Sequence, residues 1–413
     1  MLRRDYLLYL LLSFAAAILS FYKLGYLASK LSSEDFGLYS IIIISFVYIC
    51  YLGGLGGSDY VLKLGSMTAF DKRSELFLMR NNAIFYGLLG VFAISLALLL
   101  LSYLFFSTQI YWVVLAAVAL AICTLPYNVF ESYYRATQAP LVFSGMLLGK
   151  AIFVIAGIYI LVDDFGIAGI LISELVALAV IVFVCVVKNF NLIRFGGLEW
   201  PCVAIKKMIR NGFYISVSNL LRNISITADR YIVTLFLGVY SLGVYSFVMI
   251  LYQGSVLFSG IIMNIFGPYL IRRYSSNPSS REVATLLWKV VASLAIIAAS
   301  VFPLFAHLTK FFVGVFFQNY NNSDVYFMLN MIYVASITSF FIFLLDWFFI
   351  CISKEYLISM LSSFSFVLIL LSIIFFNVLD IDLKSYVVFF MVVRVVVFLV
   401  MAVLVVRYAR KGA

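Results

Sequence analysis

Twelve apolar runs, each long enough to cross a bilayer as a helix, follow one another along the 413 residues with short connections between them. A hydrocarbon layer of about 30 Å needs about 20 helical residues at about 1.5 Å each. Because the backbone finds no water there, such a run has to be a helix. The sequence therefore predicts an all-α membrane protein of about twelve transmembrane helices. The runs begin near Tyr6, Gly37, Ala83, Tyr111, Leu141, Gly166, Gly212, Gly243, Val283, Val325, Tyr356 and Ser385.

The composition agrees with a bilayer as the solvent of this chain. Hydrophobic residues make up 65% and charged residues 11%, against about 45 to 50% apolar residues in soluble domains. The basic start and apolar run of residues 1–23 also suit a signal peptide, which is the alternative to a first span. We expect a retained span, because the run exceeds a usual signal-peptide core and its pattern recurs later in the chain.

Basic residues are distributed unequally between the two sides of the membrane. When the connections are assigned alternately to two sides, one side receives only Lys30, Lys310 and Lys384, and nearly all other loop lysines and arginines fall on the opposite side. The positive-inside rule then predicts that both termini are cytoplasmic. Basic cytoplasmic loops also account for the net charge of +10, so we expect no nucleic-acid partner.

The chain divides into two related halves of six spans. The longest connection, 189–211, contains an amphipathic stretch and predicts a cytoplasmic crossover helix between an N-lobe, 1–188, and a C-lobe, 212–413. Segments 32–40 (SSEDFGLYS) and 238–246 (GVYSLGVYS) align at a constant offset, which matches Gly37 with Gly243 and Tyr39 with Tyr245. Both segments lie in the outer turn after the first span of a half. The halves are therefore predicted to be parallel repeats, pseudo-symmetric about an axis along the membrane normal.

Ionisable residues inside the bilayer are candidates for function, because each costs roughly 2.5 to 3.5 kcal/mol on insertion scales. The span that begins near Gly212 carries a polar stripe at helical spacing, which predicts a face toward a partner helix or a water-filled cavity. Three cations, Lys150, Arg222 and Arg394, are expected at similar depth. An ammonium and guanidinium groups suit phosphate oxygens, so they predict an anion site. The stripe consists of Ser218, Asn219, Arg222, Ser225, Asp229 and Val233.

A second group of charges lies nearer the outer ends of the spans. At the repeat offset Lys23 aligns with Asp229, which is followed by Arg230. We hypothesise that Lys23 and Asp229 form a gate bridge that closes in one conformational state; the alternative is that each charge is satisfied within its own lobe. Glu174 is deep enough to carry a proton, and its span is an equally good place for a partner within the lobe.

The sequence gives no support to enzyme or metal chemistry. His307 is the only histidine, and the five cysteines are scattered without a CxxC pair, which removes most zinc and haem sites. No serine-histidine-acid set is present, and the connections leave no room for a catalytic domain. Four glycines between residues 53 and 57 lack the lysine and helix of a phosphate loop, so close packing or a bend is expected there. We therefore expect a transporter without a cofactor, not an enzyme.

Four segments resemble one family of transporters in order and spacing. Segment 27–66, LASKLSSEDFGLYSIIIISFVYICYLGGLGGSDYVLKLGS, resembles the first hairpin of Wzx-type polysaccharide flippases, in the multidrug/oligosaccharidyl-lipid/polysaccharide (MOP) exporter superfamily. Segments 134–145 (YRATQAPLVFSG) and 164–177 (DFGIAGILISELVA) are similar to its turn before the fifth span and its turn into the sixth. Segment 228–273, which begins ADRYIVTLFLG, is similar to the seventh and eighth spans.

The resemblance implies a V-shaped, two-lobed, MATE-like flippase of the bacterial cytoplasmic (inner) membrane. Its expected substrate is an undecaprenyl-pyrophosphate-linked oligosaccharide, either an O-antigen of lipopolysaccharide or a capsule or exopolysaccharide repeat unit, moved by alternating access. Expected partners are this lipid-linked oligosaccharide, membrane lipids, and polysaccharide polymerase and chain-length proteins. The family places spans one, two, seven and eight around the cavity, which adds weight to Lys23, Arg222, Asp229 and Arg230 and removes some from Glu174 and Arg394.

Substrate binding is therefore assigned to Arg222, Lys150 and Arg230, and gating or coupling to Lys23, Asp229 and Glu174, with H⁺ or Na⁺ as the candidate coupling ion. Two rival functions remain. A multidrug or small-solute antiporter of the same superfamily would favour an acid-rich pocket, whereas deep cations outnumber deep acids here. A membrane polysaccharide polymerase or ligase tends to carry a large outer loop, and the outer connections here are short.

Overall fold

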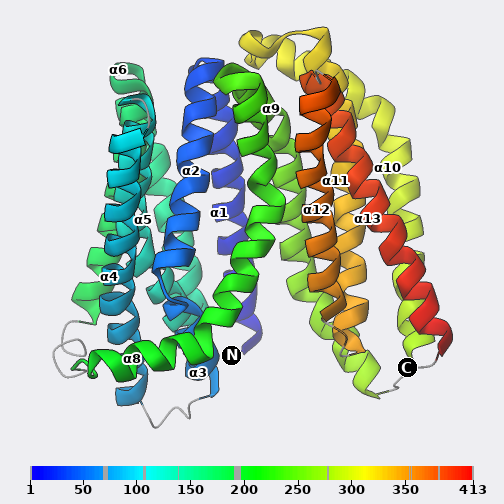
Figure 1. Ribbon diagram of the computed structural model, residues 1–413. Coiled ribbons are helices and arrows are strands. Elements are labelled where there is room, and N and C mark those ends of the chain that lie inside the picture. The colour runs from blue at the N-terminus through cyan, green and yellow to red at the C-terminus, as the bar shows by residue number, and fades with distance from the viewer. Residues whose placement is uncertain are drawn as a thin grey trace. The chain divides into compact units, whose positions relative to one another are not determined.

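The computed structural model describes residues 2–67, 73–105, 108–137, 139–189, 197–276, 279–352, 354, 356–379 and 382–411. Within these residues the side chains of some helical positions, Arg222 among them, are outside the description. Nearly all of the described chain is helical (Figure 1). The α-helices are α1 (Leu2–Lys30), α2 (Ser33–Gly53), α3 (Gly57–Met67), α4 (Arg73–Phe105), α5 (Thr108–Ala136), α6 (Pro140–Lys188), α8 (Pro201–Met208), α9 (Tyr214–Ser276), α10 (Ser280–Phe316), α11 (Ser323–Cys351), α12 (Tyr356–Leu379) and α13 (Leu383–Lys411).

Two of these helices are each two spans joined through a glycine. Helix α6 has 49 residues and breaks at Gly166, where φ is 53°, and α9 has 63 residues and breaks at Gly238, where φ is 81°. Only glycine adopts such angles without steric cost. Ten helices of the described chain are long and apolar enough to cross a membrane, and the two breaks raise this to about twelve spans. The prediction of an all-α protein with about twelve spans is confirmed.

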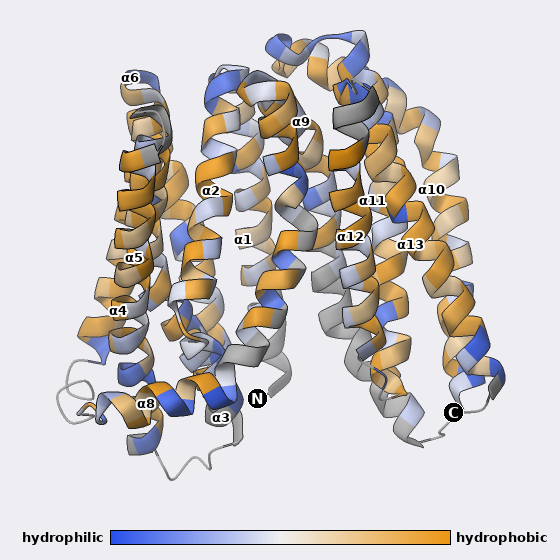
Figure 2. Ribbon diagram, viewed as in Figure 1, coloured by the Kyte–Doolittle hydropathy of each residue, from blue (hydrophilic) through white to orange (hydrophobic). Residues whose placement is uncertain are grey.

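Hydrophobic residues dominate these helices along most of their length (Figure 2). Many large apolar side chains remain exposed on the helix surfaces, for example Phe92, Ile160 and Leu235. A soluble domain rarely leaves so much contiguous apolar surface uncovered. This surface is suited to lipid, in agreement with a multi-pass membrane protein.

The chain forms two compact units, and helices α1, α2 and α9 are each divided between them. The first contains residues up to Lys23 together with 38–223, and the second contains 24–37 together with 224–413. Helices α2 to α6 and α8 contribute to the hydrophobic core of the first unit, and α9 to α13 to a core of the second. By their contacts the C-terminal end of α1 and the start of α2 thus belong to the second unit. The linear division into 1–188, 189–211 and 212–413 stays a prediction.

The glycine segment after α2 contains both the bend and the close packing that the sequence predicts. Helix α2 ends at Gly53, and the chain turns through Leu55 and Gly56, both with positive φ, before α3 begins. A Cβ atom on Gly90 of α4 would collide with the carbonyl oxygen of Gly53. The separate helix α3 was not expected, because the apolar run continues through the glycines and hides the turn.

A short amphipathic helix precedes α9; its role as a cytoplasmic crossover between two lobes stays a prediction. Helix α8 buries Ala204 and Met208 and exposes Val203 and Lys206, and a π-helical turn, Ile209–Phe213, leads on to α9. The main chain of Glu199 ties this segment to α4: its N–H donates to Asn82 Oδ1 at 3.1 Å, and its carbonyl accepts from the Tyr86 hydroxyl at 2.5 Å.

Candidate functional site

In the first unit a buried carboxylate collects donors from two other helices. Glu174, in the second part of α6, is 5% exposed. Its Oε1 accepts from Lys23 Nζ of α1 at 2.6 Å and from the Tyr39 hydroxyl of α2 at 3.2 Å. Burying a carboxylate is costly unless it is paired and hydrogen-bonded. The ion pair and the tyrosine hydrogen bond together satisfy Glu174 in an apolar environment.

Lys150, in the first part of α6, adds a second cation to this group. Its Nζ lies 5.0 Å from the centre of the Tyr127 ring of α5 and within electrostatic range of Glu174 and Lys23. No acceptor among the described residues takes a hydrogen bond from this ammonium group. Lys23 is committed to Glu174, so Lys150 is the cation of the group that is available to an incoming anion.

The second unit contains a comparable group around Asp229 of α9, which is fully buried. The Tyr245 hydroxyl donates to Asp229 Oδ2 at 2.5 Å, and the N–H of Arg230 donates to Oδ1 at 3.0 Å. The Tyr245 ring meets the Tyr386 ring of α13 edge-on, with 5.7 Å between the centroids. Arg394 of α13 lies within electrostatic range of the Asp229 carboxylate.

Two arginines of this group carry N–H donors that the described residues do not satisfy. Arg394 is 8% exposed; its Nη1 donates to Ser365 Oγ at 3.4 Å, while Nε and Nη2 have no acceptor there. Its guanidinium lies 4.9 Å from the Phe390 ring centre and 5.5 Å from that of Tyr252. Nε of Arg230 is also without a described acceptor. Unsatisfied buried donors are costly, and an anion would satisfy them.

The two groups are counterparts with the charges exchanged. The repeat offset pairs Lys23 with Asp229, and Tyr39 with Tyr245. In both units the paired tyrosine donates to the buried carboxylate. In the first unit the acid comes from the last of the six spans, and in the second from the first of its six. Each buried acid has two cations within electrostatic range, namely Lys23 and Lys150 for Glu174, and Arg230 and Arg394 for Asp229. In the first unit the half-buried Glu131, which pairs with Arg135, is also within electrostatic range of Lys150.

The structure places most of the predicted site residues in these two groups. Lys23, Lys150 and Glu174 lie together, and Asp229 and Arg230 lie together with Arg394. The Arg222 side chain is outside the described residues. Lys23 and Asp229 belong to different units, so their gate bridge stays a prediction. Each of the two residues has a partner within its own unit.

Part of the polar stripe on α9 is satisfied within the first unit. Asn219 Nδ2 donates to Asp59 Oδ1 of α3 at 3.3 Å. Asn223, which is not one of the stripe residues, donates through Nδ2 to the Tyr51 hydroxyl of α2 at 3.2 Å. This portion of the stripe faces partner helices, which is one of the two predicted surroundings.

The tyrosines of both groups were not among the site residues predicted from the sequence, and Glu174 and Arg394 received less weight there than Lys23 and Arg230. Tyr39 and Tyr245 already stood out as an aligned pair in the repeat, and that alignment was the signal for them. Glu174 and Arg394 lost weight because the resemblance favours other spans. Only the packing shows that Glu174 contacts a residue of the first span.

Comparison with known proteins identifies the fold. No family model and no curated protein matches the sequence. A solved multidrug resistance MATE family transporter of the MOP superfamily, in an inward-facing conformation, is similar over 98% of this chain and 98% of its own, with 14% identity and a TM-score of 0.72. A Vibrio cholerae MATE transporter, VcmN, covers 99% of this chain and 97% of its own, with 13% identity and a TM-score of 0.65.

A MOP superfamily transporter from Pyrococcus furiosus is also similar, over 98% of this chain and 96% of its own, with 14% identity and a TM-score of 0.62. Its description reads "reverse polarity of binding pocket suggests different function". These similarities extend over almost the whole length of each chain. The protein therefore has the fold of the MATE family transporters of the MOP superfamily.

Proposed function

We propose that this protein is a flippase that moves an undecaprenyl-pyrophosphate-linked oligosaccharide across the bacterial cytoplasmic membrane. The observation that supports this function most is the charge of the two groups, each with two cations for one buried acid. Such an excess of positive charge at buried positions suits an anionic headgroup. A pyrophosphate offers several acceptor oxygens to ammonium and guanidinium groups.

In this proposal Lys150, Arg230 and Arg222 bind the pyrophosphate, and Arg394 joins them because two of its donors lack a described acceptor. The sugar is hydrated and the polyprenyl tail is apolar, so the head needs a polar route while the tail stays in lipid. Alternating access provides that route without exposing the charge to hydrocarbon. O-antigen, capsule and exopolysaccharide repeat units share this chemistry.

The second candidate is multidrug or small-solute antiport. The MATE transporter with the TM-score of 0.72 is described as a multidrug resistance protein, and the same fold accommodates a binding pocket of reversed polarity. The fold is thus compatible with both functions. The flippase fits better, because a pocket for organic cations would be expected to hold more acids than bases.

The proposal has further features that come from the sequence pattern or from the resemblance. Both termini are cytoplasmic, a gradient of H⁺ or Na⁺ drives transport through Asp229 or Glu174, and no cofactor is required. Polysaccharide polymerase and chain-length proteins act on the product at the outer face.

A deletion strain tests the function directly. Surface polysaccharide should disappear, and undecaprenyl-linked repeat units should accumulate on the cytoplasmic side of the membrane, where an impermeant sugar-modifying probe does not reach them in intact cells. Accumulation on the outer side would contradict the flippase and favour a polymerase. Normal polysaccharide together with increased sensitivity to cationic drugs would favour the antiporter.

Lys150→Gln should reduce flipping by roughly tenfold to a hundredfold, because a hydrogen bond to a charged group contributes about 1.5 to 3 kcal/mol. Lys150→Arg should retain most of the activity, since it keeps the charge. The measurement is surface polysaccharide in the deletion strain, normalised to the amount of protein in the membrane. Lys289→Gln, at an exposed position of α10, is the matched control and should have little effect. Equal activities of the two glutamine variants would remove Lys150 from the binding site.

A further inference from the structure

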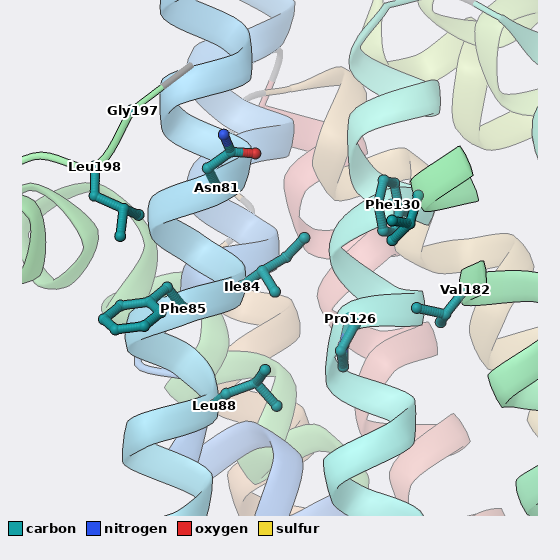
Figure 3. Close-up of a pocket in the computed structure, with 10 residues that line it drawn as sticks. Asn81, Ile84, Phe85, Leu88, Pro126, Phe130, Val182, Gly197 and Leu198 are labelled. Carbon is teal, nitrogen blue, oxygen red and sulfur yellow. The ribbon is translucent and has the colours of Figure 1, made fainter. Parts of the chain in front are cut away.

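The first unit contains a cavity of about 710 Å³ on a face that the charged groups do not use. Ile84, Phe85 and Leu88 of α4 border it on one side, and Pro126 of α5 and Val182 of α6 on the other (Figure 3). Gly197 and Leu198, ahead of α8, lie at one end beside Asn81. The volume is within the range of about 300 to 1,000 Å³ that is usual for small-molecule sites.

The lining of this cavity is apolar except for Asn81, and the surrounding surface is apolar as well. Phe85 and Leu198, which line it, are 46% and 51% exposed. The neighbouring residues Leu89, Phe183 and Val187 are 52%, 67% and 54% exposed. On a membrane protein an exposed surface of this kind faces lipid chains, not water. A hydrocarbon chain is therefore the natural occupant of the cavity.

The end near Asn81 and Leu198 differs from the rest, because the segments that form it continue into charged residues, most of them basic; the one acid among them, Glu199, is paired with Lys207. Arg80 is fully buried beside the cavity; Nε and Nη2 donate to Asn81 Oδ1 at 3.3 and 3.1 Å, and Nη1 has no described acceptor. Lys188 ends α6 two residues beyond Val186, which lines the cavity, and Lys206 is exposed on α8. An apolar cavity with basic residues near one end is complementary to an amphiphile with an anionic head.

The cavity and the Lys150 group use different faces of α5. Tyr127 contacts the Lys150 ammonium, whereas Pro126 and Phe130 face the cavity. A ligand in the cavity thus touches the helix that carries one wall of the charged group without occupying that group.

We propose that this cavity is a binding site for an anionic phospholipid of the membrane leaflet on the α8 side. One acyl chain lies along α5 between α4 and α6, and the phosphate lies near Asn81, Lys188 and Lys206. Segment 197–199, already held to α4 by the Glu199 main chain, closes the head end of the site. The bound lipid contacts α4, α5, α6 and segment 197–199, and so links these elements of the first unit.

Native mass spectrometry of the purified, delipidated full chain tests the site by titration with phosphatidylglycerol or phosphatidylcholine. The first phosphatidylglycerol should bind several-fold more tightly than the first phosphatidylcholine. Leu88→Trp fills the cavity and should weaken that first binding by roughly tenfold. Leu89→Trp is the matched control, because Leu89 is adjacent on α4, exposed and outside the lining. Equal binding by these two variants would overturn the site.

A second pair of variants tests the site independently, in case Leu88→Trp does not fold. Val182→Trp on α6 should also weaken binding, and Val184→Trp, which points outward two residues away, should not. The double variant Lys188→Gln with Lys206→Gln should abolish the preference for phosphatidylglycerol over phosphatidylcholine. A preference that survives this change would contradict the proposed head position. Tighter binding of undecaprenyl phosphate than of phosphatidylglycerol, lost in Leu88→Trp, would overturn the phospholipid as the occupant.

Discussion

Replacing Gly243 with alanine should destabilise the second unit severely and abolish transport. A Cβ atom at position 243 would collide with the carbonyl group of Ser33 at the start of α2. The clash is with main chain, so no side-chain rotation relieves it. Overpacking usually costs about 1 to 3 kcal/mol, and occasionally more, and a main-chain collision should exceed this range. The measurement is the melting temperature of the purified protein in detergent, together with surface polysaccharide in the deletion strain.

The site of this clash is where the two repeat segments meet. A Cβ on Gly37 would lie 2.5 Å from the Val239 carbonyl oxygen and 3.0 Å from the Gly243 nitrogen. The glycines that align in the repeat thus pack against each other within the second unit, and Gly37→Ala should have a similar effect.

Gly145→Ala is the control for the Gly243 variant. Gly145 lies in helix α6, and a Cβ there meets nothing within 4 Å. Alanine should be neutral or stabilise the helix by up to about 1 kcal/mol. If Gly243→Ala melts at the same temperature as Gly145→Ala, the close approach of α2 to α9 is wrong.

Removal of Lys23 should be the second large effect, because it leaves the buried Glu174 carboxylate without the cation that donates a hydrogen bond to it. Loss of one partner of a buried ion pair typically costs about 3 to 5 kcal/mol, so Lys23→Met should lower the free energy of unfolding by about that amount. Tyr39 then offers a single hydrogen bond at 3.2 Å, and Lys150 offers only a longer-range attraction. The double variant Lys23→Met with Glu174→Met should recover most of the loss, since two apolar groups replace the pair.

The control uses an ion pair of the same length at the surface. Lys384 and Asp324 are also 2.6 Å apart, but their side chains are 42% and 43% exposed, against 17% and 7% for Lys23 and Glu174. Lys384→Met should therefore cost at most about 1 kcal/mol. A cost for Lys23→Met no larger than that of Lys384→Met, or no recovery in the double variant, would show that the pair does not hold the first group together. The experiment is a double-mutant cycle of unfolding in detergent.

Much of the helix arrangement was readable from the sequence because the signal is local. The length of an apolar run limits where a span lies, and Gly166 marks a turn because few other residues reach a positive φ. The end of α2 at Gly53 was harder to place, since apolar residues continue through the turn and the contact with Gly90 comes from a distant helix.

The site could be predicted only in part, for a related physical reason. A charged residue within an apolar run is easy to recognise in the sequence, and because its insertion into the membrane is costly it is a candidate for function. Lys23, Lys150, Glu174 and Asp229 were identified as candidates in this way. Their partners depend on the register and rotation of packed helices, which no local pattern encodes. Glu174 is separated from Lys23 by 151 positions and still lies 2.6 Å from it.

The sequence by itself determined the membrane as solvent, the spans, the repeat and the identity of the deep charges. These are properties of single segments, set by the cost of placing apolar groups in water and polar groups in lipid. Only the tertiary structure decided that Glu174 pairs with Lys23 and that the Tyr245 hydroxyl donates to Asp229. It also decided that two donors of Arg394 remain unsatisfied within the described residues. Pairing is decided there because a buried charge takes whichever partner the packing brings within hydrogen-bonding distance, however distant that partner is along the chain.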